Sequence, residues 1–330
     1  MNDSHIQVRN LSKTYRVPVR PEGLRASVGS LFHPTYDDIP AVKGISFDVH
    51  AGEVVGFIGP NGAGKTTTLK MLSGLIHPTS GELTVLGFEP WKRDAKYLKR
   101  ISIVMGNKSQ MLWDIPPMDS FRVLGEIYNV PAGQFKQTLD EIIELLDMQE
   151  LLTKPVRNLS LGERMKCELA ASLLYRPAVL FLDEPTLGLD VSMQLRLRKF
   201  LADYNRRSGV TVILTSHYMA DVTALCPRVI LIHNGSLMFD GELSSLARDL
   251  APYKLLRLTL LEVTSMESLK LPEGAEITER EGLGLSIRVP RADAPDITAN
   301  LLQTLPVSDL TVEDPPIEAV IDRVYTGGSL

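Results

Sequence analysis

The chain has 330 residues, of which 44% are hydrophobic and 23% charged, and it carries a formal net charge of −5 at pH 7. This length predicts two domains, and the composition is that of an ordinary globular protein, which excludes the disordered and collagen-like classes. The acidic balance argues against the broad basic face that nonspecific DNA binding requires, so we expect no nucleic-acid partner.

Membrane and secretory segments are not expected either. Uninterrupted apolar stretches such as residues 178–182 and 229–232 are far shorter than the ~18 residues that a membrane span needs. The first residues show neither a basic region nor an apolar core of a signal peptide. Two cysteines cannot form a disulfide framework, and no Cys/His cluster has zinc spacing. A reducing cytoplasm is therefore the expected compartment.

The first predicted elements are strands. Residues 6–8 and 44–49 alternate apolar and polar side chains, as half-buried strands do. Residues 54–58 form a continuous apolar run before a glycine-rich turn, which is typical of a fully buried strand. Residues 16–40 form an insertion rich in Pro and Arg, in which a helical stretch carries a narrow apolar face of Leu24, Val28, Leu31 and Phe32.

Helices then alternate with buried strands. Apolar residues at helical spacing predict helices over residues 66–76, 133–152, 160–175 and 192–205. Short apolar runs predict strands over residues 101–105, 179–182 and 210–214. A strand–helix–strand order predicts a βαβ unit and a mainly parallel sheet, so the expected fold class is α/β.

The pattern changes near Asp240. Short strands (residues 255–263, 275–280, 285–289 and 310–312) and two helices (294–305 and 317–325) predict a small α+β unit. We therefore expect one domain over residues 1–240, with the insertion at 16–40 and a helical subdomain at about 107–176. A small α+β accessory domain is expected over residues 241–330.

Residues 59–66 satisfy the pattern G-x-x-x-x-G-K-[ST] between a buried strand and a helix. Glycines let backbone N–H groups turn toward phosphate oxygens, and the helix N-terminus adds positive potential. Lys65 would reach the β- and γ-phosphates, and the Thr66 hydroxyl would bind Mg²⁺. The alternative is a glycine-rich turn that matches the pattern by chance. A chance match is not expected to lie between a buried strand and a helix, as this segment does. The predicted nucleotide-binding residues are Gly59, Pro60, Asn61, Gly62, Ala63, Gly64, Lys65, Thr66 and Thr67.

Two carboxylates follow the apolar run of residues 179–182. Asp183 at the carboxyl end of a strand can hold Mg²⁺, and Glu184 can accept a proton from an attacking water. A solvated acidic strand end would be the simpler interpretation if the phosphate loop were absent. Together the two elements predict a P-loop NTPase.

A third segment narrows the class of NTPase. Residues 159–164, LSLGER, resemble the Leu-Ser-Gly-Gly-Gln signature of ATP-binding cassette (ABC) proteins, with Leu161 and Glu163 in place of a glycine and the glutamine. Ser160 and Glu163 also predict a capping box. The other motifs of the family follow in its order, over about residues 5–240: the adenine-stacking aromatic at Tyr15, the D-loop at 187–190 and the switch histidine at His217.

The resemblance implies an ABC cassette with a mainly parallel core sheet, an antiparallel β-subdomain and a helical subdomain, which binds ATP and Mg²⁺. It also implies that His217 donates a hydrogen bond to the γ-phosphate and holds Glu184 and the attacking water in line with it. Because the phosphate loop of one cassette faces the signature of another, a single copy implies a homodimer or heterodimer. Ser160 and Gly162 would then contact the γ-phosphate across the interface, and Asp190 would couple the two sites.

One position of the family pattern has two candidates. The family places a glutamine, which binds Mg²⁺ and meets the membrane partner, after a strand like residues 101–105. Here the sequence continues Gly106-Asn107-Lys108-Ser109-Gln110, so Asn107 or Gln110 could serve. The residue type favours Gln110.

Three kinds of cassette protein compete: a transporter subunit, a soluble ATPase of DNA repair or translation, and a non-hydrolysing regulator. The sequence has no long coiled-coil insertion and no second cassette, and it keeps Glu184, so the transporter subunit is preferred. The insertion resembles that of polysaccharide exporters, and residues 309–320 resemble the tail of drug-resistance exporters. This implies ABC-2 type permease partners, export, and a peripheral position on the inner face of the cell membrane. Two alternatives stay open: an insertion helix packed on its own β-subdomain, and a tail that stabilises the dimer.

Overall fold

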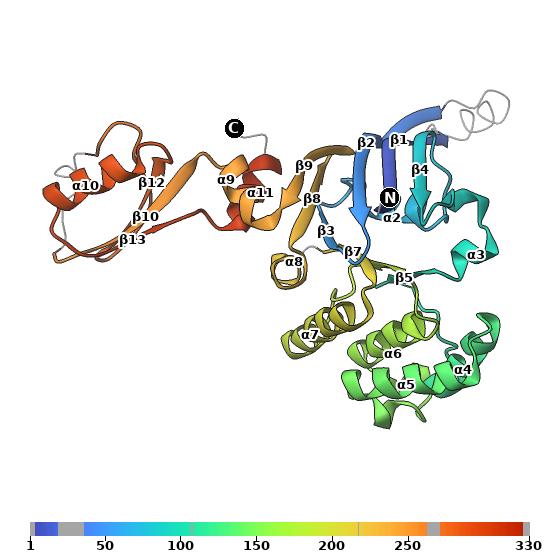
Figure 1. Cartoon of the computed structure of the whole chain (residues 1–330). Helices are drawn as coiled ribbons and strands as arrows, with labels where there is room; N and C mark the ends of the chain where they lie inside the picture. The colour runs from blue at the N-terminus through green and yellow to red at the C-terminus, as the bar shows by residue number, and fades with distance from the viewer. Residues whose placement is uncertain (1–3, 19–35, 107, 217, 263–270, 326–330) are drawn as a thin grey trace, which may run out of the picture. The chain divides into compact units, whose positions relative to one another are not determined.

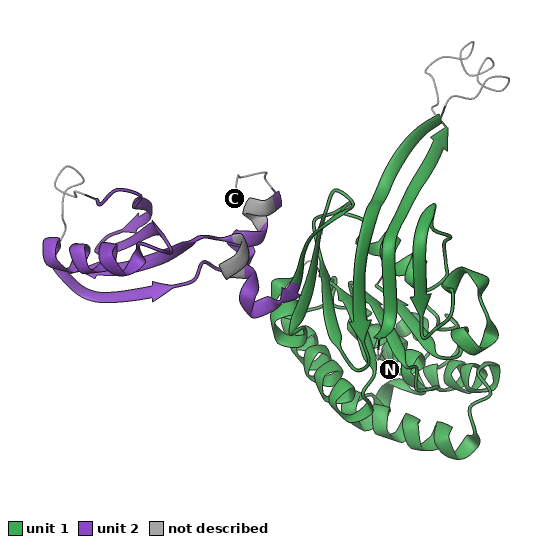
Figure 2. Cartoon of the chain, turned by 45° about the horizontal axis from the view of Figure 1, so that its top comes forward, with its two compact units in different colours: residues 1–240 green, residues 241–330 purple. Residues whose placement is uncertain are grey.

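The computed structural model describes residues 4–18, 36–106, 108–216, 218–262 and 271–325 (Figure 1). The chain divides into two compact units, Met1–Asp240 and Gly241–Leu330 (Figure 2). The predicted apolar stripe of Leu24, Val28, Leu31 and Phe32 lies outside the described residues, as do Asn107 and His217.

A six-stranded sheet forms the centre of the first unit. Its order is β5 (Ile101–Met105), β6 (Val179–Asp183), β7 (Thr211–Thr215), β3 (Val54–Ile58), β8 (Arg228–His233) and β9 (Ser236–Glu242). The pairs from β5 to β8 are parallel. Parallel strands are covered on both faces, which is why they are continuous apolar runs in the sequence. The expected α/β class with a mainly parallel core is confirmed.

A second, antiparallel sheet has the order β2 (Tyr36–His50), β1 (Ser4–Pro18) and β4 (Ser80–Val85). Strand pairing continues into both ends of the predicted insertion, where Arg16 faces Asp38 and Pro18 faces Tyr36. Residues 16–18 and 36–40 at the ends of the predicted insertion therefore belong to β1 and β2. Their strand structure was missed because strand residues exposed on both faces need no apolar alternation.

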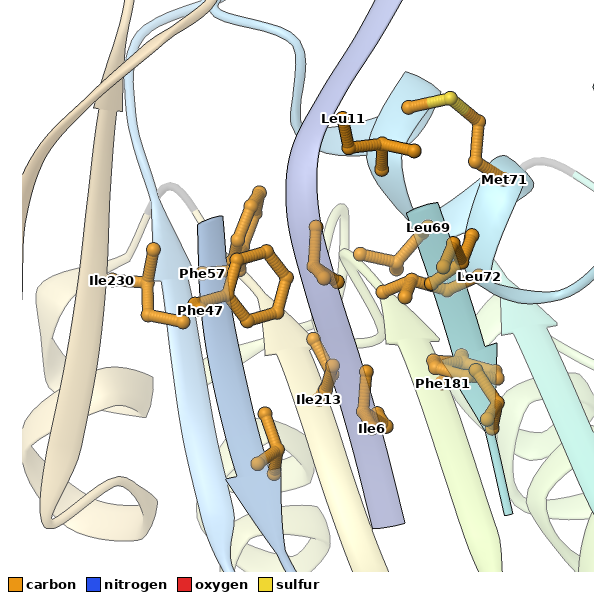
Figure 3. Close-up of a cluster of buried hydrophobic side chains, with 14 of the residues drawn as sticks. Ile6, Leu11, Phe47, Phe57, Leu69, Met71, Leu72, Phe181, Ile213 and Ile230 are labelled. Carbon is orange, nitrogen blue, oxygen red and sulfur yellow. The ribbon is translucent and has the colours of Figure 1, made fainter. Parts of the chain in front are cut away.

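The two sheets and helix α2 (Lys65–Leu72) enclose one buried apolar core (Figure 3). Ile6 of β1, Phe47 of β2, Phe57 of β3, Leu69 of α2 and Phe181 of β6 all lie in it. Burial of one such side chain contributes about 1.5–3 kcal/mol. Because its apolar face is anchored in this core, α2 holds its N-terminus at the end of β3.

The helices that were predicted in the first unit differ from the observed ones mainly in their ends. The helix expected over 133–152 ends at Leu146, where Asp147 takes a left-handed conformation with φ 48°. Helices α3, α4 and α8 and strands β4, β8 and β9 were not predicted. The helices are α3 (Ala95–Leu98), α4 (Pro117–Ile127), α5 (Ala132–Leu146), α6 (Leu161–Leu173), α7 (Val191–Ser208) and α8 (Met219–Leu225), with 3₁₀ turns at Pro90–Lys92, Gln149–Leu151 and Val156–Asn158.

The second unit is a small α+β fold. Its antiparallel sheet has the order β11 (Glu276–Glu281), β12 (Gly284–Pro290), β10 (Tyr253–Leu260) and β13 (Val307–Glu313). Helix α10 (Ala294–Thr304) shares a buried cluster with this sheet. Two further helices, α9 (Leu243–Leu250) and α11 (Ile317–Tyr325), contact each other. Of these elements only α9 was not predicted.

Candidate functional site

The glycine-rich loop lies between β3 and α2, as the sequence predicted. A Cβ on Gly59 would lie 2.3 Å from the Ile232 carbonyl oxygen. Gly64 has φ 108°, and a Cβ there would lie 2.5 Å from the Ala41 carbonyl oxygen. Neither position accepts a side chain unless the backbone moves. The loop is therefore held closely against β8 and β2, with the N-terminus of α2 behind it.

Lys65 is enclosed by this loop. Its side chain is 5% exposed, and Nζ donates hydrogen bonds to the carbonyl oxygens of Gly59 at 2.6 Å and Pro60 at 3.0 Å. Burial lowers the pKa of Lys65, while the charges of Glu184 and Asp183 act in the opposite direction. The ammonium group is thus held inside the loop, where a phosphate group would meet it.

Thr66 and Asp183 come together at the carboxyl end of the parallel sheet. The Thr66 hydroxyl donates to Asp183 Oδ1 at 3.1 Å, and the Thr215 hydroxyl donates to the same oxygen at 2.7 Å. Carboxylate and hydroxyl oxygens are the hard ligands that Mg²⁺ prefers. These side chains therefore fit a magnesium ion bound beside the phosphate loop.

Glu184 follows in an unusual backbone conformation. Its φ is 54°, and its backbone N–H donates to both the carbonyl oxygen and the hydroxyl of Thr215, each at 3.1 Å. A left-handed conformation of a non-glycine residue costs on the order of 1–3 kcal/mol and is common at functional sites. The end of β7 therefore holds Glu184 in a fixed, strained position beside Asp183.

The structure does not bring Gln110 to this cluster. Its side-chain amide donates to the Ile103 carbonyl oxygen of the edge strand β5 at 3.0 Å, and its backbone N–H donates to the buried carboxylate of Glu168 at 2.9 Å. Within the described part of the chain, Gln110 makes no hydrogen bond to Asp183 or Thr66. The other candidate, Asn107, directly follows Gly106, whose N–H donates to the Asp183 carbonyl oxygen at 3.1 Å.

The predicted capping box is present at the start of α6. The Glu163 N–H donates to the Ser160 hydroxyl at 3.3 Å, and the Ser160 N–H donates to the Glu163 carboxylate at 2.8 Å. The bond from the Ser160 backbone lowers the pKa of Glu163. A Cβ on Gly162 would lie 3.0 Å from Met193 Cγ on α7, so α7 leaves little room for a side chain there.

Asp190 caps the neighbouring helix α7. Its Oδ1 accepts hydrogen bonds from the Met193 N–H at 2.9 Å and the Ser192 hydroxyl at 2.7 Å. The bond from Ser192 lowers the pKa of Asp190 the most. The exposed carboxylate therefore stands at a helix N-terminus, beside the start of the signature helix.

Tyr15 lies on the antiparallel sheet whose strand β2 contacts the phosphate loop. It lies in β1 opposite Ile39 of β2, and β2 continues to Ala41, the residue whose carbonyl faces Gly64. Its side chain is 36% exposed, with the Lys13 ammonium 5.4 Å from the ring centre. The ring is thus partly exposed, on a strand that pairs with the strand contacting the loop.

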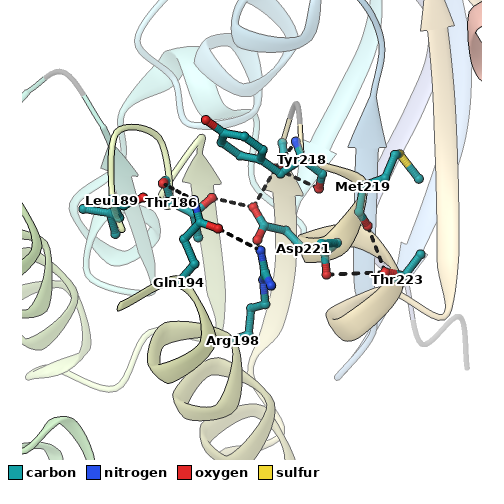
Figure 4. Close-up of polar contacts among 10 residues, drawn as sticks. Thr186, Leu189, Gln194, Arg198, Tyr218, Met219, Asp221 and Thr223 are labelled. Atoms are coloured by element: carbon teal, nitrogen blue, oxygen red, sulfur yellow. Dashed lines mark hydrogen bonds and ion pairs between the residues drawn. The ribbon is translucent and has the colours of Figure 1, made fainter. Parts of the chain in front are cut away.

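Sequence reasoning missed a buried polar cluster around Asp221 of α8 (Figure 4). Asp221 is fully buried and forms an ion pair with Arg198 of α7, at 2.5 Å from Nε. Its carboxylate also accepts hydrogen bonds from the hydroxyls of Thr186 and Ser216. Thr186 and Ser216 stand inside predicted motifs, but the sequence holds no signal that a carboxylate on the next helix joins them.

None of the helices in the described ranges combines the length and the apolar composition that crossing a membrane requires.

Two family models match the chain. A model described as ABC transporter matches residues 42–187, and one described as EvrA-like ABC transporter, C-terminal domain, matches residues 252–313. The first match contains the phosphate loop, the signature segment and the Asp183–Glu184 pair.

Curated relatives are ATP-binding proteins. The ABC transporter ATP-binding protein NatA of Bacillus subtilis is 33% identical, over 63% of this chain and 84% of its own. The linearmycin resistance ATP-binding protein LnrL of Bacillus subtilis is also 33% identical, over 66% of this chain and 70% of its own. The Nod factor export ATP-binding protein I of Burkholderia thailandensis is 35% identical, over 62% of this chain and 67% of its own.

Solved structures share the fold. The ATP-binding subunit of an ABC transporter superposes with a TM-score of 0.62 at 21% identity, covering 74% of this chain and 93% of its own. A dimeric ATP-binding cassette in a post-hydrolysis state, bound to ADP and Pi, has a TM-score of 0.58 at 21% identity, with coverages of 72% and 98%.

Proposed function

The chain belongs to the family of ABC transporter ATP-binding proteins, and from this premise we propose that it powers a separate ABC-2 type permease in export. As a member of this family it is the ATP-binding, ATP-hydrolysing subunit of a transporter. The observation that carries the proposal for the site is the contact of Thr66 with Asp183 beside the enclosed Lys65.

The phosphate chain would lie along residues 59–67, where backbone N–H groups and Lys65 neutralise its charge. Thr66 and Asp183 are the proposed Mg²⁺ ligands. The third is Asn107, which follows the Gly106 that is bonded to Asp183, or Gln110 if its amide leaves Ile103. Bound Mg²⁺ would neutralise charge that develops on the β- and γ-phosphates. Tyr15 would stack on adenine. These assignments rest on the positions of the side chains around the loop.

Glu184 is the proposed general base. It directly follows Asp183, the proposed metal ligand at the end of β6, and its carboxylate would take a proton from the attacking water. His217, which lies outside the described residues, is proposed to hold that water and the γ-phosphate in line. The strained backbone of Glu184 supports a role that depends on the orientation of its carboxylate as well as on its charge.

We further propose that two cassettes close on two ATP molecules. Ser160 and Gly162 at the start of α6 would contact the γ-phosphate bound to the partner, and Asp190 would join the two sites. The dimeric, nucleotide-bound state of a cassette with the same fold supports this arrangement. Closure on ATP and release after hydrolysis would move the attached permeases as a ligand-driven population shift.

Export and a peripheral position on the cytoplasmic face of the membrane are proposed from the names of the relatives, which include a resistance protein and an export protein. The match of residues 252–313 to the C-terminal domain of an ABC transporter model supports an accessory role for the second unit.

The test of the site is ATP affinity measured by calorimetry on the full-length chain. Lys65→Ala should weaken binding strongly because the β- and γ-phosphates lose their nearest cation. Lys70→Ala, on the same helix α2 but in its last turn, is the matched control and should bind as the unchanged chain does. Equal affinities of the two variants would contradict the proposed site.

The test of the permease proposal is purification of the tagged full-length chain from detergent-solubilised membranes of its own host. An ABC-2 type membrane protein should co-purify in stoichiometric amount. Recovery of the chain with no membrane protein, under conditions that preserve ATPase activity, would contradict this part of the proposal.

A further inference from the structure

Asp221 is a carboxylate that the proposed chemistry does not use, although its burial is complete. A buried charge is retained only when it is paired and hydrogen bonded. Asp221 meets this condition through three partners from three different segments: Arg198 of α7, Thr186 in the segment after β6, and Ser216 at the end of β7. The carboxylate therefore joins three separate segments of the chain.

Two of these partners stand on either side of Glu184. Thr186 lies two residues after it in the chain. Ser216 directly follows Thr215, whose carbonyl and hydroxyl oxygens hold the Glu184 N–H. The contacts therefore form a closed ring from Glu184 to Thr215 and Ser216, across Asp221, and back through Thr186. This ring surrounds the residue that is held in a left-handed conformation.

The same cluster reaches the D-loop through α7. Arg198 donates to the Gln194 side-chain oxygen at 3.2 Å, and the Gln194 amide donates to the Leu189 carbonyl oxygen at 3.1 Å (Figure 4). Leu189 is the residue before Asp190. One buried carboxylate is thus connected both to the proposed general base and to the segment proposed to meet the second cassette.

We propose that Asp221 is a positioning residue, which holds Glu184 in its catalytic orientation through the hydroxyls of Thr186 and Ser216 and couples that orientation to the D-loop. Asp221 does not touch the nucleotide or the attacking water. Its effect is on the direction in which the Glu184 carboxylate points. The inference rests on the proposed role of Glu184 as general base.

Substitution of Asp221 itself is a poor test, because it leaves Arg198 buried beside an unpaired site and can unfold the protein. The hydroxyl partners give a cleaner one. Thr186→Val and Ser216→Ala each remove one side of the ring and keep the ion pair, and Ser216→Ala also removes the bond that the hydroxyl accepts from the Tyr218 N–H at 3.0 Å. Thr223→Val is the matched control, because Thr223 lies on α8, the helix of Asp221, and is outside the ring. Its hydroxyl donates to carbonyl oxygens of α8, at 3.0 Å for Met219 and 3.4 Å for Ala220.

The measurements are steady-state ATPase of the full-length chain, ATP affinity by calorimetry, and melting temperature. Each ring variant should lower kcat by about 10- to 100-fold, as misdirection of a catalytic group does, and change KM and ATP affinity by less than about threefold. The double variant should lose little more than either single one, because one substitution already breaks the connection through Asp221. Thr223→Val should keep the kcat of the unchanged chain.

Three results would overturn the inference. The first is a kcat of the ring variants equal to that of Thr223→Val. The others are a kcat that falls in proportion to the drop in melting temperature, or a double variant whose loss of kcat is the product of the two single losses. Glu184→Gln, measured in parallel, separates this from a failure of the proposed function. If Glu184→Gln retains turnover, the general-base assignment is wrong. If Glu184→Gln is inactive and the ring variants are not impaired, only the role of Asp221 is wrong.

Discussion

Thr66 and Asp183 are 117 positions apart in the chain, yet the hydroxyl of one donates a 3.1 Å hydrogen bond to the carboxylate of the other. The contact exists because α2 is anchored in the apolar core and its first turn lies over the carboxyl end of β6. It places the end of the phosphate loop beside the proposed metal ligand.

Glu184→Gln should bind ATP but hydrolyse it poorly. The amide keeps the shape of the carboxylate and loses its proton affinity, and loss of a general base typically costs ~10²–10⁴-fold in rate. Trapped ATP should then hold two chains together, which light scattering with and without ATP would detect. Glu150→Gln, an exposed change outside the site, is the control. Turnover of Glu184→Gln at the control rate would remove Glu184 from its role.

The two candidates for the third metal ligand make different predictions. The amide of Gln110 is engaged by the main chain of β5, whereas Asn107 follows Gly106, which is bonded to Asp183. Asn107→Ala should therefore raise the Mg²⁺ concentration needed for half-maximal ATPase activity more than Gln110→Ala does. A larger shift for Gln110→Ala would show that its amide leaves Ile103 when nucleotide binds.

How far the sequence predicts this site depends on which contacts are local. The phosphate loop, the capping box of Ser160 and Glu163, and the buried strands could be predicted, because each is encoded by neighbouring residues. The cluster around Asp221 could not, since its partners come from three separate segments and only the packed fold brings them together. The extension of β1 and β2 past Arg16 was missed for another reason: exposed strand residues follow no apolar pattern.

Two glycines of the phosphate loop should differ in their tolerance of alanine. Gly62 has φ 79°, and a Cβ on it would meet no atom of the described residues within 4 Å, so Gly62→Ala should cost only the left-handed strain of about 1–2 kcal/mol. Gly64→Ala adds a contact of 2.5 Å with the Ala41 carbonyl oxygen, so its total cost should reach about 2–5 kcal/mol. Urea unfolding of both variants measures the difference. Equal free energies of unfolding would show that β2 moves away from the loop at little cost.

The two units should be separable. The apolar core of the first unit draws on residues 6–237, and the clusters of the second draw on residues 251–320, so the described buried clusters share no side chain. Strand β9 ends at Glu242, and a chain ending there keeps the whole six-stranded sheet. The 1–242 fragment should therefore melt cooperatively and bind ATP with the affinity of the full-length chain, since every proposed nucleotide-binding residue precedes the cut. Calorimetry and thermal melting of the two proteins make the comparison. An insoluble fragment, or one that fails to bind ATP, would show that the second unit stabilises the cassette, and its role would then be structural as well as accessory.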